Sequence, residues 1–323
     1  MSVSMTSAEI KRKARELGFD ACGIAPAADL PELEFFREWI DRGYAGDMEY
    51  LRRSADRRGD VRRVLPSARS VIVTATIYNV DRPYSTETAD SERAHIARYA
   101  WGDDYHAVIE RRLDGLLAWL RETVPQPFEA RRYVDTGPVQ ERVYAQHAGI
   151  GWAGKNTCVI NRDLGSWLFL GEIIVSLEIE PDAPAMDQCG TCALCLEACP
   201  TGALVAPGVL DSTRCISYLT IELRGPIDQA LRSSLGTHVY GCDICQEVCP
   251  WNAAAPASND GAWQPRAAWD MRSIVELARM SDDEMRAAMR HSAMSRTKVA
   301  GLRRNLAVAI ENVEAKEAGR FGG

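Results

Sequence analysis

Residues 188–204 read QCGTCALCLEACPTGAL, and four cysteines fall within the eleven residues from Cys189 to Cys199. Their spacing is C-x2-C-x2-C-x3-C-P. Three cysteines at x2 spacings fit three corners of one iron–sulfur cube, whereas the fourth, followed by proline, ligates a neighbouring cube in bacterial two-cluster ferredoxins. Zinc ribbons instead use two C-x2-C pairs separated by a longer spacer. The run therefore predicts two [4Fe–4S] clusters that share their ligands crosswise.

The remaining cluster ligands come later in the chain. Residues 241–250 read GCDICQEVCP, which is the same pattern without its first cysteine, and Cys215 stands alone between the two runs. By the same pseudo-twofold logic all eight cysteines are used. We interpret the other two, Cys22 and Cys158, as small buried apolar side chains. We predict cluster one on Cys189, Cys192, Cys195 and Cys249, and cluster two on Cys199, Cys215, Cys242 and Cys245.

Composition restricts the class of protein. The chain has 323 residues, 46% of them hydrophobic and 26% charged, as in globular proteins. It has no apolar stretch long enough for a bilayer and no signal-peptide pattern at its start, so we expect a cytoplasmic monomer without membrane contact. In a reducing compartment, clustered cysteines are metal ligands more often than disulfides.

Charge gives a weaker indication of partners. The net charge of −7 argues against a protein that coats nucleic acid with its whole surface. Residues 52–63 and 286–304 are nevertheless locally basic. Each stretch is compatible with binding of one polyanion and equally with a solvated helical face.

Hydrophobic periodicity predicts an α+β fold with layered helices and strands. Residues 71–78 and 167–179 read as buried strands, and residues 105–124 form a strongly amphipathic helix pattern. The Pro-rich residues 180–187 read as a connector. We expect a layered α+β domain in residues 1–180, a ferredoxin-like two-cluster module in 181–256, and a helical C-terminal segment with a basic face in 257–323.

Several motifs outside the cysteine runs resemble one family. They are YVDTGPVQERVYAQHAGIGWAGKNTCVI at 133–160, GSWLFLGEI at 165–173 and SRTKVAGLRRNLAVAI at 295–310. Together with the cysteine runs they resemble epoxyqueuosine reductases over nearly the whole chain. The resemblance implies a cobalamin enzyme with a core related to reductive dehalogenases. Such an enzyme uses cob(I)alamin, fed by both clusters from a ferredoxin or flavodoxin-type donor, to reduce epoxyqueuosine to queuosine in tRNA with a GUN anticodon.

The resemblance also implies residue roles. Asp135 matches the proton donor, and we expect a desolvated site that raises its pKa so that it can protonate the epoxide oxygen. From the residues alone, Asp135 could instead cap a turn, Arg58 could be solvated, and Val159 and Phe169 could be strand core. The implied cobalamin contacts are Arg58, Asp135, Val159, Phe169, Ser217 and Asp243. We place Tyr99, Asp104 and His106 in the substrate pocket, and Arg296, Lys298, Arg303 and Arg304 on tRNA phosphates.

Two other functions remain open at this point. A cobalamin-dependent reductive dehalogenase for a small molecule would share both clusters but would not need the basic C-terminal stretch. A pure iron–sulfur electron carrier would bind no corrin. Binding of tRNA distinguishes the first alternative, and corrin absorbance distinguishes the second.

Overall fold

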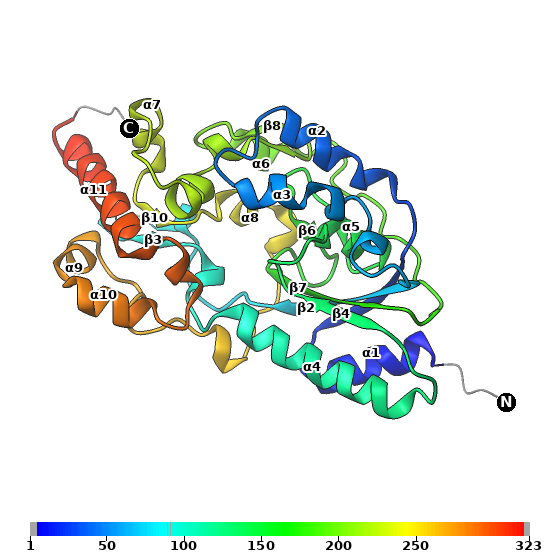
Figure 1. The fold of residues 1–323 in the computed structure, drawn as a ribbon. Helices are drawn as coiled ribbons and strands as arrows, with labels where there is room; N and C mark the ends of the chain where they lie inside the picture. The colour runs from blue at the N-terminus through cyan, green and yellow to red at the C-terminus, as the bar shows by residue number, and fades with distance from the viewer. Residues whose placement is uncertain (1–4, 89, 91, 320–323) are drawn as a thin grey trace.

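A four-stranded antiparallel sheet forms the centre of the molecule (Figure 1). The computed structural model describes residues 5–88, 90 and 92–319. β2 is buried over its whole length because helices cover both faces of the sheet, which explains its β-branched sequence. The strand order is β1 (Ala21–Pro26), β2 (Ser70–Ile77), β7 (Leu168–Val175) and β4 (Ala130–Tyr133).

The two faces of this sheet carry different helices. α1 (Ser7–Glu16) and α4 (Tyr105–Thr123) pack on one face, and α5 (Glu141–His147) packs on the other. Side chains alternate between the faces of a strand. In β7, Phe169 and Ile173 therefore join the core under α4, whereas Leu170 and Ile174 join the core under α5. The long helix and both strands predicted from periodicity are confirmed.

The arginine-rich stretch forms a helix above α5. α3 (Glu49–Arg58) follows α2 (Phe35–Asp41), and both lie on the α5 side of the sheet (Figure 1). Most of its arginines are exposed or half-buried, as expected for a solvated helical face, but Arg58 is only 9% exposed. A solvated arginine is therefore the wrong interpretation for Arg58 itself.

The cysteine segment shares structure with the chain before it. β10 (His238–Tyr240) pairs in parallel with β3 (His95–Ile96). The carboxylate of Glu247 accepts hydrogen bonds from the backbone N–H and hydroxyl of Ser85, at 2.9 and 2.6 Å. Residues before and after the connector at 180–187 thus hold one another in place. The short elements of this region are β5 (Trp152–Ala153), β6 (Val159–Ile160), α6 (Leu194–Glu197), β8 (Leu204–Ala206), β9 (Val209–Leu210), α7 (Gln229–Arg232) and α8 (Ile244–Glu247).

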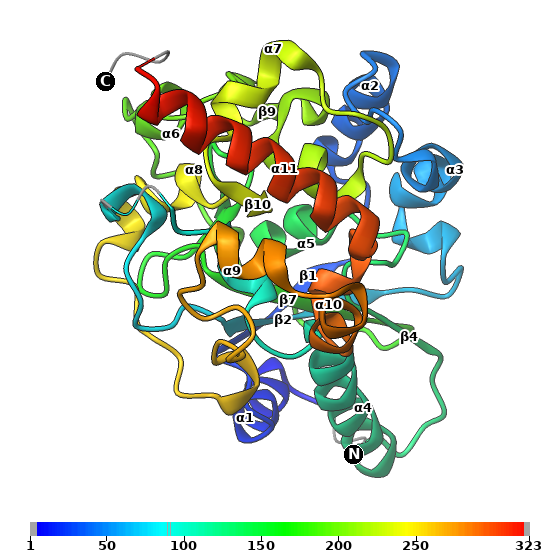
Figure 2. The same ribbon diagram turned by 90° about the vertical axis from the view of Figure 1, so that its left-hand side faces the viewer.

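The C-terminal segment is helical, as predicted. α9 (Ile274–Arg279), α10 (Asp282–Met289) and α11 (Lys298–Glu317) pack around β3 and β10 to form a third apolar core. Figure 2 shows α11 crossing over β10 and reaching towards α7. Among the described residues, no helix combines the length and the apolar character that a bilayer crossing requires.

Candidate active site

The cysteines of the two runs occupy equivalent local structures. In each run a one-turn helix, α6 or α8, carries a cysteine at its second position and is followed by a Cys-Pro pair. Cys249 packs against Cys189 and Trp152. Burial, and then the neighbouring thiols of Cys189, Cys195 and Cys192, raise the pKa of Cys249. The structure therefore gathers four thiols from both runs at one place.

A second group of thiols comes from the same segment. Burial raises the pKa of Cys215, and the Cys199 thiol beside it adds to the effect. Burial likewise raises the pKa of Cys242, whose neighbour is Cys215, and that of Cys245, which is influenced by Cys158, Cys242 and Cys215. These neighbours are the set that the spacing assigns to cluster two.

Donors around the thiols fit ligands that become thiolates. The backbone N–H of Ala203 lies 3.3 Å from Sγ of Cys199, and the indole N–H of Trp152 lies 3.4 Å from Sγ of Cys189. Such donors to sulfur tune iron–sulfur clusters. Within the described part of the chain, no three His, Cys, Asp or Glu side chains are close enough to hold one metal ion. The iron–sulfide core of a cluster would lie between more widely spaced thiolates.

Asp135 stands in a tight turn after β4. Its backbone is left-handed (φ 55°), and the N–H of Thr136 donates to the carbonyl of Val134 at 2.5 Å. A Cβ on Gly137 would lie 2.4 Å from the ring of Tyr133, so only glycine fits there. The side chain of Asp135 is 61% exposed. The turn therefore presents this carboxylate to open space.

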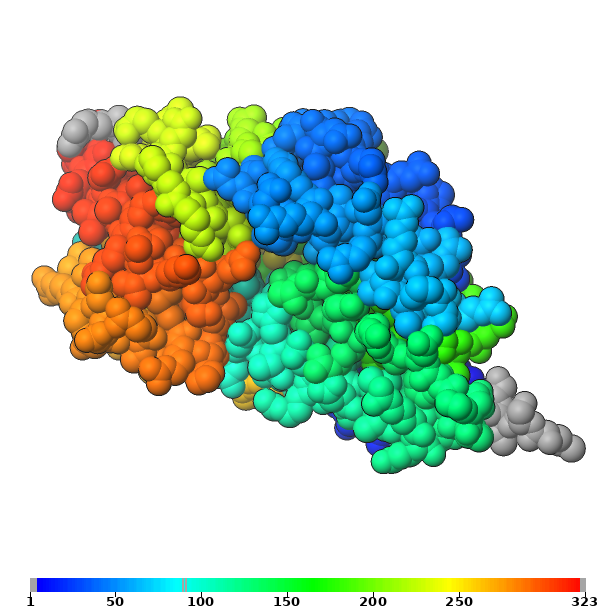
Figure 3. Space-filling view, viewed as in Figure 1, coloured from blue at the N-terminus to red at the C-terminus, as the bar shows by residue number. Residues whose placement is uncertain are grey.

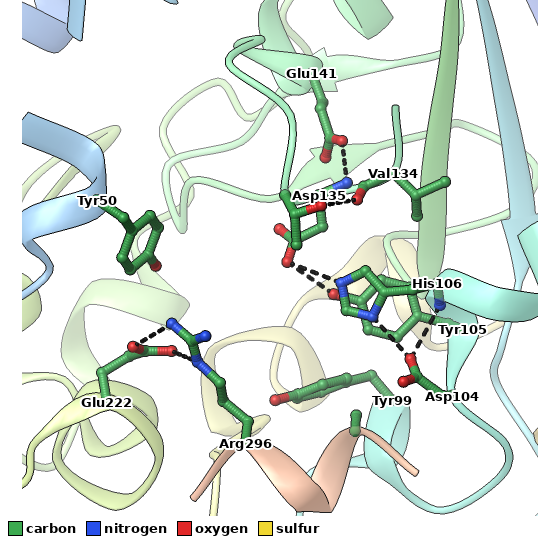
Figure 4. Close-up of polar contacts among 12 residues, drawn as sticks. Tyr50, Tyr99, Asp104, Tyr105, His106, Val134, Asp135, Glu141, Glu222 and Arg296 are labelled. Atoms are coloured by element: carbon green, nitrogen blue, oxygen red, sulfur yellow. Dashed lines mark hydrogen bonds and ion pairs between the residues drawn. The ribbon is translucent and has the colours of Figure 1, made fainter. Parts of the chain in front are cut away.

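The start of α4 supplies the partners of this carboxylate (Figure 4). The hydroxyl of Tyr105 donates to Oδ2 of Asp135 at 2.9 Å, and Nε2 of His106 lies 3.4 Å from the same oxygen. On the other side of the imidazole, Nδ1 lies 2.7 Å from Oδ1 of Asp104. Asp104 also caps α4 by accepting from the backbone N–H of His106. One imidazole thus bridges two carboxylates.

This bridge places the proton on histidine. Burial disfavours the imidazolium, but the contacts with Asp104 and Asp135 outweigh it and raise the pKa of His106 to about 9. Desolvation by the surrounding residues would by itself raise the pKa of Asp135 despite the exposure of its side chain, yet the contact with His106, and then Tyr105 and Arg58, keep it below its ordinary value. The expected raised pKa of Asp135 is therefore wrong, because a charged partner outweighs desolvation.

Tyr50, Glu222 and Arg296 face this group across open space in Figure 4. Nε and Nη2 of Arg296 each lie 2.8 Å from a carboxylate oxygen of Glu222, and its guanidinium lies 5.4 Å from the ring centre of Tyr50. Tyr50 is 45% exposed. Figure 3 shows the surface hollowed between the blue segment that carries α3 and the orange C-terminal segment. The two walls of this hollow come from opposite ends of the chain.

The residues expected at cobalamin do not all lie together. Nη1 of Arg58 donates to the carbonyl of Val139 at 2.8 Å. Burial lowers the pKa of Arg58, and the nearby charges of Glu141 and Asp135 oppose this effect. Val159 belongs to the core under α5, whereas Phe169 lies on the opposite face of the sheet. There the Phe169 ring stacks on Tyr105, with ring centres 4.5 Å apart.

Ser217 and Asp243 accompany the second quartet. Ser217 is half-buried, and its N–H and hydroxyl interact with the thiol of Cys215. Oδ2 of Asp243 accepts from the backbone N–H of Arg98 at 2.7 Å, and burial raises the pKa of Asp243 to about 7. Asp243 is thus turned into the protein. Tyr99 donates to the hydroxyl of Tyr240 at 3.2 Å and lies in the same cluster of rings as Tyr105.

The basic C-terminal residues have different surroundings. Arg304 donates to the carbonyls of Leu219, Leu223 and Gly225, at 2.6 to 2.7 Å. Arg303 donates to the carbonyl of Ala278 and to Asp282. Lys298 is exposed and has a left-handed backbone (φ 61°). The structure therefore leaves Lys298 open to solvent, while protein acceptors occupy both arginines.

Sequence reasoning missed three residues of this site: Tyr105, Glu141 and Glu172. The backbone N–H of Asp135 donates to the carboxylate of Glu141, and Glu172 is fully buried in β7. A glutamate within an apolar strand pattern was a usable signal, since such residues are almost never buried without a purpose.

Known proteins resemble this chain over nearly its full length. Epoxyqueuosine reductases from Gloeobacter violaceus and Pseudomonas aeruginosa are 43% and 41% identical, and each alignment covers 94% of this chain and 96% or 84% of the relative. A crystal structure of an epoxyqueuosine reductase with an epoxyqueuosine-modified tRNA-Tyr stem loop is 30% identical, with a TM-score of 0.86 and coverage of 96% and 82%. A Bacillus subtilis epoxyqueuosine reductase with its catalytic aspartate loop swung out of the active site has a TM-score of 0.84.

Two cysteine quartets and an acid–imidazole site in one chain indicate an iron–sulfur oxidoreductase. Residues 188–252 match the 4Fe-4S double cluster binding domain, and residues 58–136 match the family described as Epoxyqueuosine reductase QueG, DUF1730. The chain belongs to the epoxyqueuosine reductase family. The likeness to a reductive dehalogenase is distant, at 16% identity and a TM-score of 0.45. Family membership decides against the dehalogenase and against the pure electron carrier.

Proposed function

We propose that this protein reduces the epoxide of epoxyqueuosine in tRNA to the alkene of queuosine. The contact between His106 and Asp135 carries the proposal, because it couples an exposed carboxylate to a protonated imidazole at the edge of a hollow. Removal of an epoxide oxygen takes two electrons and two protons and releases water. An acid beside the oxygen is therefore required as the C–O bond breaks.

Two cofactor types would supply the electrons. The eight cysteines would hold two [4Fe–4S] clusters, and the donors around Cys189 and Cys199 fit that role. For cobalamin, the supporting observation is that exposed Tyr50 and Asp135 face each other across the hollow. Of the six residues that the resemblance implies, we propose cobalamin contacts for Arg58 and Asp135, whose charged groups influence each other. Val159 and Phe169, which lie in different cores, and Ser217 and the inward-turned Asp243 have no such support. When bound, the clusters and cobalamin supply low-potential single electrons to the substrate.

The protein's own residues would move the proton. The His106 imidazolium passes one proton to Oδ2 of Asp135, and Asp135 delivers it to the epoxide oxygen as the first C–O bond breaks. The second proton, with which the oxygen leaves as water, comes from solvent. Asp104 stabilises the charge on His106 before the transfer, and the Tyr105 hydroxyl holds the Asp135 carboxylate in place. The charged pair His106–Asp135 thereby acts as an acid at neutral pH, although the Asp135 carboxyl is itself ionised and the proton resides on His106.

Substrate and electron donor would approach from different segments. The relative solved with a tRNA stem loop supports tRNA as the substrate class, and we propose a GUN anticodon carrying epoxyqueuosine. Exposed Lys298 is the best phosphate contact, and Arg296 lies where the modified base would enter the hollow. We further propose catalysis in residues 1–180, electron transfer in 181–256 from a ferredoxin or flavodoxin-type donor, and tRNA contacts in 257–323, in a cytoplasmic monomer.

The test is anaerobic turnover. Purified protein with reconstituted clusters is incubated with cobalamin, a reductant and epoxyqueuosine-containing tRNA, and the nucleosides are analysed by mass spectrometry. Queuosine should form, and Asp135→Asn should abolish it while tRNA binding persists. Unchanged epoxyqueuosine with the fully loaded wild-type protein would contradict the proposal.

A further inference from the structure

Glu172 is a fully buried acid in the centre of the sheet. It lies on β7 between Val73 of β2 and Tyr133 of β4, and its exposed fraction is 0%. Neither carboxylate oxygen has a hydrogen-bond donor among the described residues. An ionised carboxylate in such a place costs several kcal/mol. Glu172 therefore needs either a proton or a cation.

Its neighbour is another acid. Glu172 points to the face of the sheet on which α5 packs, Glu141 is the first residue of α5, and the Glu141 carboxyl raises the pKa of Glu172. Two carboxylates cannot hydrogen-bond, so one of them must carry a proton. Burial first, and then Glu141, raise the pKa of Glu172 well above its ordinary value, whereas the bond from Glu172 lowers that of Glu141. Glu172, which is fully buried and has no donor among the described residues, therefore carries the proton and can offer it to Glu141.

The remaining charges around this pair favour that assignment. Arg58 of α3 stabilises the ionised Glu141, and Asp135 disfavours ionisation of both glutamates. Burial and Asp135 raise the pKa of Glu141 to about 7. Glu141 is therefore protonated below about pH 7 and ionised above it, whereas Glu172 keeps its proton to a higher pH than Glu141.

Glu141 in turn stabilises the tight turn that carries Asp135. Its Oε1 accepts the backbone N–H of Asp135, a residue with a left-handed backbone that costs free energy outside glycine. Resting on the function proposed above, we propose that Glu172 and Glu141 are positioning residues that hold Asp135 in its reactive place. The neutral Glu172 donates to Glu141, and Glu141 holds the Asp135 backbone so that the carboxylate reaches His106.

Conservative and disruptive variants separate this role from packing. Glu172→Gln keeps a donor towards Glu141, whereas Glu172→Met keeps the volume but removes the donor. In steady-state assays, Glu172→Met should lower kcat at least tenfold with KM for tRNA changed less than twofold. Glu172→Gln should restore at least a third of the wild-type kcat. Wild-type kcat in Glu172→Met, or a loss confined to KM, overturns the proposal.

A measurement without substrate tests the buried proton directly. Infrared spectra at about pH 9, where Glu141 and Asp243 with pKa values of about 7 are ionised, should show the carbonyl stretch of one protonated carboxyl. This band should be absent in Glu172→Gln and retained in the exposed control Glu122→Gln. If the band persists in Glu172→Gln, the assignment is wrong even where catalysis is normal. If wild-type protein makes no queuosine, the proposed function fails, while the infrared result still decides the state of Glu172.

A second variant tests the proposal even if Glu172→Met does not fold. Glu141→Ala removes the acceptor of the Asp135 N–H at a half-buried position. It should lower kcat at least tenfold and leave KM for tRNA within twofold. A wild-type kcat in Glu141→Ala overturns the proposal independently of Glu172.

Discussion

Nε2 of His106 lies 3.4 Å from Oδ2 of Asp135, so the exposed acid of this site is paired with an imidazole. Asp104 on the other ring nitrogen makes the imidazolium stable to a pH well above the ordinary range for histidine. The two predictions that follow from this pair concern pH and proton transfer.

The raised pKa of His106 sets the alkaline limit of the reaction. Because that pKa is about 9, the proton is present below pH 9 and is lost as the pH rises through it. The single-turnover rate should stay level from pH 7 to pH 8 and fall above about pH 9. A rate profile measured with saturating tRNA checks this. A fall centred between pH 6 and pH 7 would contradict it.

Replacement of His106 should remove the proton source. Since general acid catalysis contributes about 10²–10⁴-fold, His106→Asn should lower kcat by about 10²-fold or more and abolish the alkaline limb. The matched control is His291→Asn, because His291 is exposed and asparagine tolerates its left-handed backbone (φ 57°). The control should keep wild-type kcat and an unchanged pH profile.

Iron analysis tests the two cysteine quartets. Cys245 lies in the second quartet, whereas Cys22 lies in β1, apart from both. After anaerobic reconstitution, Cys22→Ala should retain about eight irons per chain, the number for two cubes, and Cys245→Ala about four. Loss of all iron from Cys245→Ala would show that the clusters do not assemble independently, and full retention would exclude Cys245 as a ligand.

Replacement of Arg304 by alanine should affect stability, whereas replacement of Lys298 by alanine should affect tRNA binding. Arg304→Ala leaves the carbonyls of Leu219, Leu223 and Gly225 without their donor and should destabilise the protein by about 1–3 kcal/mol. Lys298→Ala should leave the melting temperature unchanged and reduce the salt dependence of tRNA binding by about one phosphate contact. Thermal melts and tRNA titrations at several salt concentrations measure both. A stable Arg304→Ala variant with weakened tRNA binding would reverse this assignment.

Glu172 should make stability depend on pH. Its folded-state pKa lies above the unfolded value, so the folded state binds more protons and loses stability as the pH rises above about 4.5. Glu172→Gln lacks this loss. The difference in melting temperature between Glu172→Gln and wild type should therefore grow from pH 5 to pH 8, by about 1–2 °C for each kcal/mol in a chain of 323 residues. A constant difference would indicate that Glu172 is ionised in the folded protein.

Local sequence signals predicted the elements of the fold better than the site. The apolar stripe of residues 105–124 and the β-branched run of residues 71–78 are dictated by burial, so both were found. Cysteine spacing is a local constraint and assigned the quartets. The state of Asp135 depends on His106 from another element, and no pattern near Asp135 reports that contact. Likewise, Glu141 and Glu172 are adjacent only because α5 packs on β7.

The parallel pairing of β3 with β10 affects how the molecule is made. His95 leaves the ribosome long before His238, so the β3 edge and the core around it have no partner during most of synthesis. Docking of β10 onto β3 and completion of both cysteine quartets must await synthesis of residues 238–249. A nascent chain arrested before β10 would expose an unpaired edge, and chaperone capture or proteolysis at that stage would set the yield of protein with both quartets filled.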